Sequence, residues 1–100
     1  MENKAIAISQ MRLHDPIDGS QHFRVVDGRT LCGLKDLALV MEHLADEVFH
    51  HHVSGDKNDF ANWVRDVIHD EALAQEMMQS LDKDGHQKII FRHIVRNYVA

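Results

Sequence analysis

Nine of the 100 residues are histidines, and some have a spacing that suits a metal ion. His43, Glu47 and either His50 or His51 follow one another at steps of three and four residues. On a continuous helix such steps put imidazole and carboxylate groups on one face, where they can bind zinc or another divalent cation. No HExxH signature accompanies them, and adjacent histidines point in different directions around a helix. The alternative interpretation is polar surface histidines or buried ones with individual hydrogen bonds.

A second candidate metal site begins at Asp82, where the sequence resembles the start of an EF-hand calcium loop. Asp82 and Asp84 fit the first and third ligand positions of such a loop. The sixth position holds Gln87 in place of glycine, and the twelfth holds His93 in place of the bidentate glutamate. We interpret this stretch as a surface turn that mimics the motif. A degenerate EF-hand-like loop is the alternative.

Motifs of the common catalytic chemistries do not occur in this sequence. It contains no nucleophile elbow, P-loop, dinucleotide-binding fingerprint or CxxC pair. Cys32 is the only cysteine, which excludes an intrachain disulfide and fits a reducing compartment. We interpret Cys32 as a small, semi-buried residue next to Gly33 and not as a nucleophile. The expectation is a protein that is no enzyme and holds no cofactor.

The composition is that of an ordinary globular domain with a mild negative charge. Hydrophobic residues make up 44% and charged residues 27% of the chain, and the formal net charge is −5. This balance argues against nucleic acid as a partner, because phosphate backbones require a basic surface. No apolar run approaches the ~20 residues of a membrane span or the ~7–15 of a secretory signal. We therefore expect a cytoplasmic protein that does not bind membranes.

From Leu34 onward, the apolar residues recur at the steps of three and four that are typical of amphipathic helices. The four predicted apolar faces contain Leu34, Leu37, Met41, Leu44 and Val48; Phe60, Trp63, Val64, Val67 and Ile68; Leu73, Met77 and Leu81; and Ile90, Ile94, Val95 and Tyr98. Asp46 is expected to divide the first stretch and cap its second helix, and Asn58 or Asp59 to cap the next helix. The fold class is therefore mainly α, a compact bundle of four to five short helices.

The N-terminal part has a different pattern. Residues 1–22 contain a proline and turn-forming residues, which predict a loosely ordered arm before a single helical domain at residues 23–100. Short β-forming stretches on either side of Asp27-Gly28 predict a small β-hairpin. An Asp-Gly pair is typical of a type I′ turn, in which both central residues have positive φ.

The segments NDFANWVRDV at residues 58–67 and DEALA at residues 70–74 support a family resemblance. They resemble the motif of a family of small prokaryotic helical domains of unknown function. The resemblance extends over residues 23–80 and implies a helical accessory domain, with no activity assigned. His69 stands where that family usually has glycine, a residue that ends helices in a left-handed turn.

The same motif contains the candidate interaction surface. Asn62, Arg65 and Asp66 lie off the apolar face, and Asp70 and Glu71 begin the following helix. The alternative is a purely structural role, in which caps stabilise the helices and Arg65 pairs with Asp70 or Glu71. We predict a non-catalytic adaptor or accessory domain that binds another protein. Divalent-metal binding is the alternative function, and homodimerisation stays open.

Overall fold

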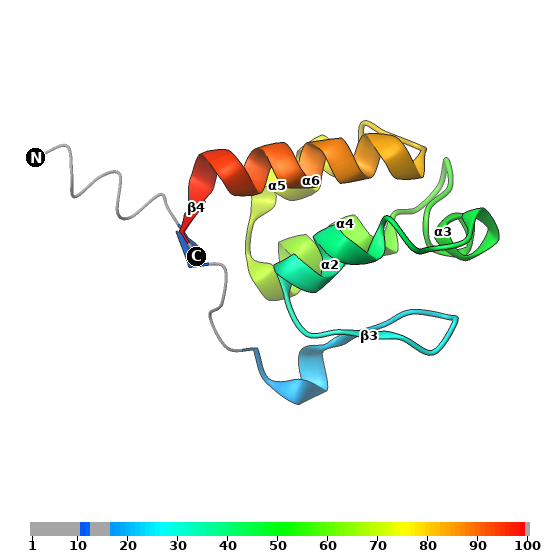
Figure 1. Cartoon of the computed structure of the whole chain (residues 1–100), viewed down its shortest axis with the longest axis horizontal. Helices are drawn as coiled ribbons and strands as arrows, with labels where there is room; N and C mark the ends of the chain where they lie inside the picture. Colours follow the sequence, from blue (N-terminus) through cyan, green and yellow to red (C-terminus); the bar gives the residue numbers. More distant parts are fainter. Residues whose placement is uncertain (1–10, 13–16, 100) are drawn as a thin grey trace, which may run out of the picture.

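The structure, a computed structural model, describes residues 11–12 and 17–99 (Figure 1). Within these residues the chain forms five α-helices and a small antiparallel hairpin, which confirms the mainly α fold class. The helices are α2 (Leu34–Val40), α3 (Asp46–His52), α4 (Asp59–Trp63), α5 (Glu71–Met77) and α6 (Lys83–Asn97). The shorter elements are the 3-10 helix η1 (Gly19–Gln21), the π-helix η2 (Val64–Ile68), and strands β1 (Met11–Arg12), β2 (Phe23–Arg24), β3 (Thr30–Leu31) and β4 (Tyr98–Val99).

Three helices begin where a side chain can replace the missing helical hydrogen-bond partner. The Asn58 side chain accepts a hydrogen bond from the Ala61 amide at the start of α4. Asp70 does the same at the start of α5, and Asp82 at the start of α6. The predicted cap at Asn58 is confirmed, and Asp59 is the first helical residue.

The first apolar stretch divides close to the predicted point. α2 ends at Val40, a turn follows, and α3 begins at Asp46. Ala45 takes the cap position without a side-chain hydrogen bond, so the predicted cap at Asp46 is wrong by one residue. Asp46 instead lies in the first turn of α3, where a carboxylate complements the helix dipole.

The EF-hand-like stretch is helical. α6 starts immediately after Asp82, and its continuous helical backbone extends through His93. A calcium loop needs an irregular backbone that wraps its ligands around the ion. The degenerate EF-hand-like loop is therefore not formed. The predicted surface turn is also wrong, because the residues that follow Asp82 are helical and the turn lies earlier, at residues 78–79. The aspartate at position 82 is a helix cap.

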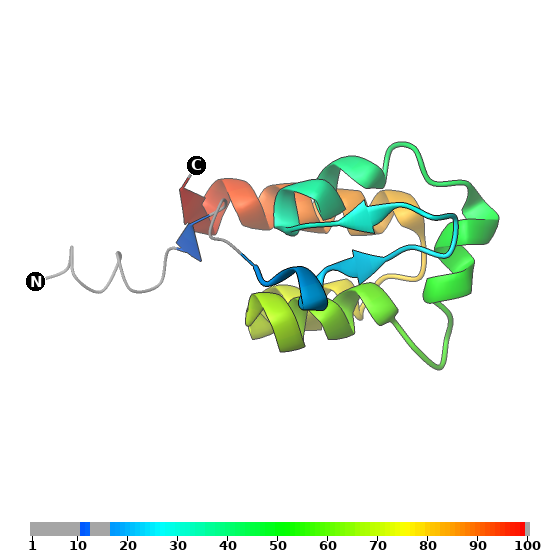
Figure 2. The same cartoon turned by 90° about the horizontal axis from the view of Figure 1, so that it is seen from below.

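Strands β2 and β3 pair antiparallel and confirm the predicted hairpin, which lies across one side of the helices (Figure 2). The type I′ turn is wrong, because Gly28 has a positive φ of 103° whereas Asp27 does not. The Gly28 amide donates to the Val25 carbonyl at 2.9 Å, and the Val25 amide to the Arg29 carbonyl at 2.8 Å. These bonds define a three-residue loop, which needs a single left-handed residue at its end.

The core takes apolar side chains from all five helices and from the hairpin. Stacked rings form its centre, with Phe60 4.9 Å from Phe23 and 6.2 Å from Phe49 between ring centroids. Two residues predicted on buried faces are exposed instead, Leu81 at 58% and Val95 at 81%. Leu81 follows the end of α5, and Val95 lies on the outer side of α6. The predicted semi-buried position of Cys32 is also wrong, because this residue is exposed.

Part of the predicted N-terminal arm packs onto the helices. The indole N–H of Trp63 donates to the Gln21 carbonyl at 2.7 Å, and Ile17 packs against the core. Residues 17–22 are thereby held, while residues 1–10 and 13–16 of the predicted arm lie outside the described residues. β1 pairs in parallel with β4. Among the described residues, no helix has the length and apolar character needed to cross a membrane.

Candidate functional site

A groove lies between the loop that joins α3 to α4 and the connection from α5 to α6. It encloses about 570 Å³, including space open to solvent. Its lining combines two exposed apolar side chains with polar groups. The lining residues are Ser54, Gly55, Asp56, Lys57, Asn58, Asn62, Met78, Ser80 and Leu81.

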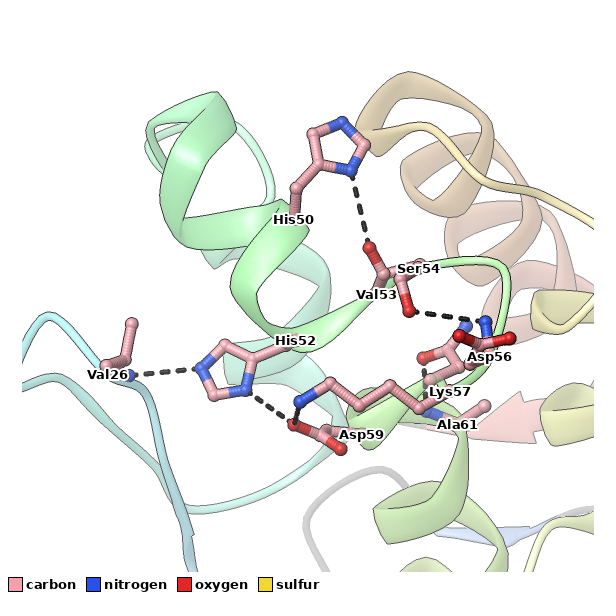
Figure 3. Close-up of polar contacts among 10 residues, drawn as sticks. Val26, His50, His52, Val53, Ser54, Asp56, Lys57, Asp59 and Ala61 are labelled. Atoms are coloured by element: carbon pink, nitrogen blue, oxygen red, sulfur yellow. Dashed lines mark hydrogen bonds and ion pairs between the residues drawn. The ribbon is translucent and has the colours of Figure 1, made fainter.

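One wall of the groove is a loop with a defined conformation (Figure 3). The Ser54 amide donates to the Lys57 carbonyl at 2.9 Å, and the Asp56 amide donates to the Ser54 hydroxyl at 3.2 Å. The Lys57 ammonium lies 3.2 Å from an Asp59 carboxylate oxygen. Because these contacts lie within the loop or reach the start of α4, the wall is formed before any ligand binds.

The opposite wall supplies the apolar surface. Met77 is fully buried, whereas the adjacent Met78 is 46% exposed. Leu81 is the more exposed of the two apolar side chains on this wall. The Ser80 hydroxyl accepts a hydrogen bond from the Asp82 amide at 3.3 Å, and this bond shapes the connection from α5 to α6.

Asn58 and Asn62 line the groove with different roles. The Asn58 amide group is buried and fully engaged, with Oδ1 bonded to Ala61 and Nδ2 to His86. Asn62 is half-buried, and within the described residues its side-chain amide makes no hydrogen bond. An amide offers both a donor and an acceptor. Asn62 is therefore the side chain best suited to bind the backbone of an extended partner.

The other predicted interaction residues do not gather around this groove. Arg65 and Asp66 are exposed on η2 and pair with each other, with distances of 2.9 and 3.2 Å. Their mutual hydrogen bonds raise the pKa of Arg65 and lower that of Asp66. The alternative pairing of Arg65 with Asp70 across the turn is wrong, whereas the charge of Glu71 adds a smaller contribution to the raised pKa of Arg65. Glu71 is exposed at the start of α5.

Asp70 belongs to a buried network and not to the surface. It is 8% exposed, and its Oδ2 lies 2.8 Å from Nε2 of His93 and accepts a 2.6 Å hydrogen bond from the Tyr98 hydroxyl. Its Oδ1 caps α5 through the Leu73 amide. Burial, together with the Asp70 carboxylate, raises the pKa of Tyr98 far above its ordinary value. This network ties the end of α6 to the start of α5.

His52 joins the hairpin to the helices (Figure 3). Its Nε2 accepts a hydrogen bond from the Val26 amide at 3.1 Å, so Nδ1 carries the proton and donates to Asp59 at 3.0 Å. Partial burial opposes the charge of Asp59, but hydrogen bonds from His52 and Lys57 lower its pKa below the ordinary value. Because a backbone amide occupies Nε2, this His–Asp pair has a structural role and offers no free base.

The predicted histidine–glutamate cluster is not assembled. His43 lies in the turn between α2 and α3, so the continuous helix that would stack it over Glu47 is interrupted. His50 points to the Val53 carbonyl at 3.4 Å (Figure 3). His51 is exposed on α3. No group of three or more metal-ligating side chains is arranged around one point in the part of the chain that the structure describes.

Residues of the two candidate metal sites meet at a second hollow. It is lined by Asp46, His50, Asp82, Lys83 and Asp84. The Lys83 ammonium donates to the Leu44 carbonyl at 2.7 Å and lies 3.4 Å from an Asp46 carboxylate oxygen. A positive charge supplied by the chain itself therefore already lies beside the Asp46 carboxylate.

The candidate site combines residues that the sequence analysis singled out with residues that it missed. Asn62 was a predicted interaction residue, whereas Met78 and Leu81 were not. The sequence does contain one indication of an exposed methionine, because the adjacent Met77 and Met78 cannot both face the core.

The chain matches no family model, no curated protein and no solved structure.

Proposed function

We propose that this chain is a non-catalytic domain that binds a segment of another protein in the groove beside Asn62. The observation that carries the proposal is that one hollow brings together exposed Met78 and Leu81 and the Asn62 amide, which makes no hydrogen bond to any described residue. An apolar side chain of the partner would cover the two apolar groups, and the amide would bond to its backbone. Burying a valine, leucine, isoleucine, phenylalanine or methionine side chain contributes about 1.5–3 kcal/mol to the free energy of binding.

The structural role of the buried polar groups and the lining of the groove support this proposal. The His52–Asp59 and His93–Asp70 pairs connect structural elements, because Asp59 also pairs with Lys57 and Asp70 also caps α5. The groove also combines an apolar wall with a polar wall, and protein-binding surfaces use both kinds of contact. The resemblance of residues 58–74 to small helical domains supports an accessory role. We place the protein in the cytoplasm as part of the same proposal.

A peptide selection tests the groove. A library of random peptides is selected on the wild-type protein and counter-selected on the Leu81→Glu variant. We expect the enriched peptides to share an apolar residue and to lose at least ~10-fold in affinity toward that variant, equal to ~1.4 kcal/mol. Backbone amide shifts measured by NMR are expected to change at residues 54–58, 62 and 78–81.

Leu39→Glu is the matched control, because it places the same charge at an exposed apolar position on α2, outside the groove. It is expected to leave affinity for the selected peptides unchanged. Equal losses in both variants, or shift changes confined to another surface, would contradict the groove. A second copy of this chain is the other candidate to occupy the groove. Sedimentation of the free protein at increasing concentration tests whether it forms a dimer.

A further inference from the structure

The outer side of α6 carries a second surface of a different character, here called the basic–apolar face. It contains Lys88, Phe91, Arg92, Val95 and Arg96, all of which are exposed. Figure 1 shows α6 along one edge of the molecule. The opposite side of the helix buries His86, Ile90 and His93 against the rest of the protein.

The spacing arranges this face in two parallel rows. Lys88, Arg92 and Arg96 follow at steps of four residues, so their cations form one row along about 12 Å of helix. Phe91 and Val95 also lie four residues apart and form an adjacent apolar row. Phe91 is 38% exposed and Val95 is 81% exposed.

The three cations have no anionic partner in the described part of the chain, unlike four other basic residues there. Ion pairs are formed by Arg29, Lys57, Arg65 and Lys83. Like charges four residues apart on a helix repel each other and destabilise it. Within the described residues, the three like charges therefore form an uncompensated row beside two exposed apolar groups, and an external anion would relieve their repulsion.

The basic–apolar face is positively charged, whereas the rest of the chain is negatively charged. The whole chain has 11 basic and 16 acidic residues. Without these three cations the remainder has 8 basic residues against 16 acidic ones, a formal charge of −8. A positive face on an otherwise negative protein selects for a partner that is anionic and small enough to touch only that face.

We propose that the basic–apolar face of α6 binds an acidic amphipathic helix of a partner protein. A helix with carboxylates at steps of four residues matches the cation row, and an adjacent row of apolar side chains matches Phe91 and Val95. This surface is distinct from the groove and goes beyond the function proposed for it. A nucleic acid or an anionic membrane is disfavoured, because either would extend over the acidic remainder of the chain.

Two synthetic helical peptides of about 18 residues, roughly five turns, serve as probes. The acidic peptide has a row of glutamates beside a row of leucines, and the neutral peptide has glutamine at each glutamate position. Fluorescence anisotropy is expected to show at least ~10-fold tighter binding of the acidic peptide at low salt, with the difference reduced as salt is added. Vesicles of phosphatidylserine and phosphatidylcholine are tested in parallel.

Arg92→Glu is expected to weaken acidic-peptide binding at least ~10-fold. Arg24→Glu is the matched control, because Arg24 is also exposed and without an ion pair among the described residues, and both changes shift the net charge equally. The control is expected to change the affinity by less than ~2-fold. Arg92→Gln replaces the reversed charge if circular dichroism shows that Arg92→Glu is unfolded.

Three results would overturn the proposal. The first is equal binding of the acidic and neutral peptides, and the second is an equal loss in the Arg92 and Arg24 variants. The third is binding to vesicles but not to the acidic peptide, which would assign the face to a membrane surface. The Leu81→Glu variant is expected to bind the acidic peptide like wild type, so failure of the groove and failure of this face are distinguishable.

Discussion

The side-chain amide of Asn58 donates a hydrogen bond to Nε2 of the fully buried His86 at 2.8 Å. The orientation of this amide is set at its other end, where Oδ1 accepts from the Ala61 backbone. Nε2 must therefore be unprotonated, and Nδ1 donates to the Asp82 carbonyl at 3.1 Å. One polar contact thus links the cap of α4 to the cap of α6 and requires a neutral histidine.

This contact makes stability depend on pH. Burial lowers the pKa of His86 below its ordinary value of 6.5, although the Asp82 carbonyl and carboxylate act in the opposite direction. A lowered folded-state pKa stabilises the protein above 6.5, and that stabilisation is lost as the pH falls toward the folded-state value. We expect urea denaturation to give a smaller free energy of unfolding at about pH 5 than at about pH 7.5.

Asn58→Asp isolates this contribution, because aspartate can still cap α4 while its carboxylate favours the charged imidazole. We expect NMR titration to show a raised pKa for His86 in this variant. The difference in stability between variant and wild type should therefore shift in favour of the variant as the pH falls. Parallel pH profiles of the two proteins would show that His86 is not the titrating group.

His52 is expected to hold the hairpin on the helices. His52→Ala removes the acceptor of the Val26 amide and the donor to Asp59, and it also removes a ring that lies 5.1 Å from Phe23. We expect a loss of about 2–4 kcal/mol in the free energy of unfolding. Hydrogen exchange should become faster at the Val26 amide. His51→Ala is the control, since His51 is exposed on the same helix, and unchanged Val26 exchange in His52→Ala would contradict the assignment.

His69 is the described residue other than glycine that has a positive φ, with φ 64° and ψ 33°. This left-handed conformation is unfavourable for a residue with a Cβ atom. His69→Gly is expected to raise the free energy of unfolding by about 1 kcal/mol. The control His51→Gly, in the helical backbone of α3, should lower it by about 1 kcal/mol. Urea denaturation is the measurement. A lower free energy of unfolding for His69→Gly than for the wild type would show that the backbone at His69 is not strained.

Gly85 is required by close packing at the start of α6. A Cβ atom at this position would collide with the Ser80 hydroxyl and come within 2.9 Å of an Asp82 carboxylate oxygen. We therefore expect Gly85→Ala to lose about 1–2 kcal/mol by displacing the cap, although alanine favours helices. Thermal denaturation is the measurement. Adding Ser80→Ala should recover part of the loss, and no recovery would place the strain elsewhere.

Trp63 is expected to hold residues 17–22 through its hydrogen bond to the Gln21 carbonyl. Trp63→Phe keeps a ring in the core but removes the donor, and we expect a loss of about 1–3 kcal/mol, including the smaller ring. Limited proteolysis should then cleave the chain near residues 17–22 before the helices unfold. Unchanged cleavage would show that Ile17 alone suffices to hold this segment.

Local patterns in the sequence located the helical regions, the hairpin and the start of α4 at Asn58. The spacing of the apolar residues located the helical regions, because a helix brings residues three and four apart onto one face. Asn58 predicted a helix start, since a cap is a contact between residues close in sequence. The hairpin followed from β-forming residues around Asp27-Gly28. The bulk of the fold class therefore depends on local interactions that a sequence records directly.

The tertiary structure decided which polar residues meet and which apolar residues stay exposed. Asn58 and His86 are 28 residues apart, and nothing in their local spacing indicates that they bond. Leu81 and Val95 match the apolar periodicity, yet neither is covered, because an amphipathic pattern does not say where the neighbouring element ends. Asp82 resembled a calcium ligand until the helix that it caps was known. Contacts across the fold depend on how helices pack, and this is why both proposed surfaces emerged only from the assembled domain.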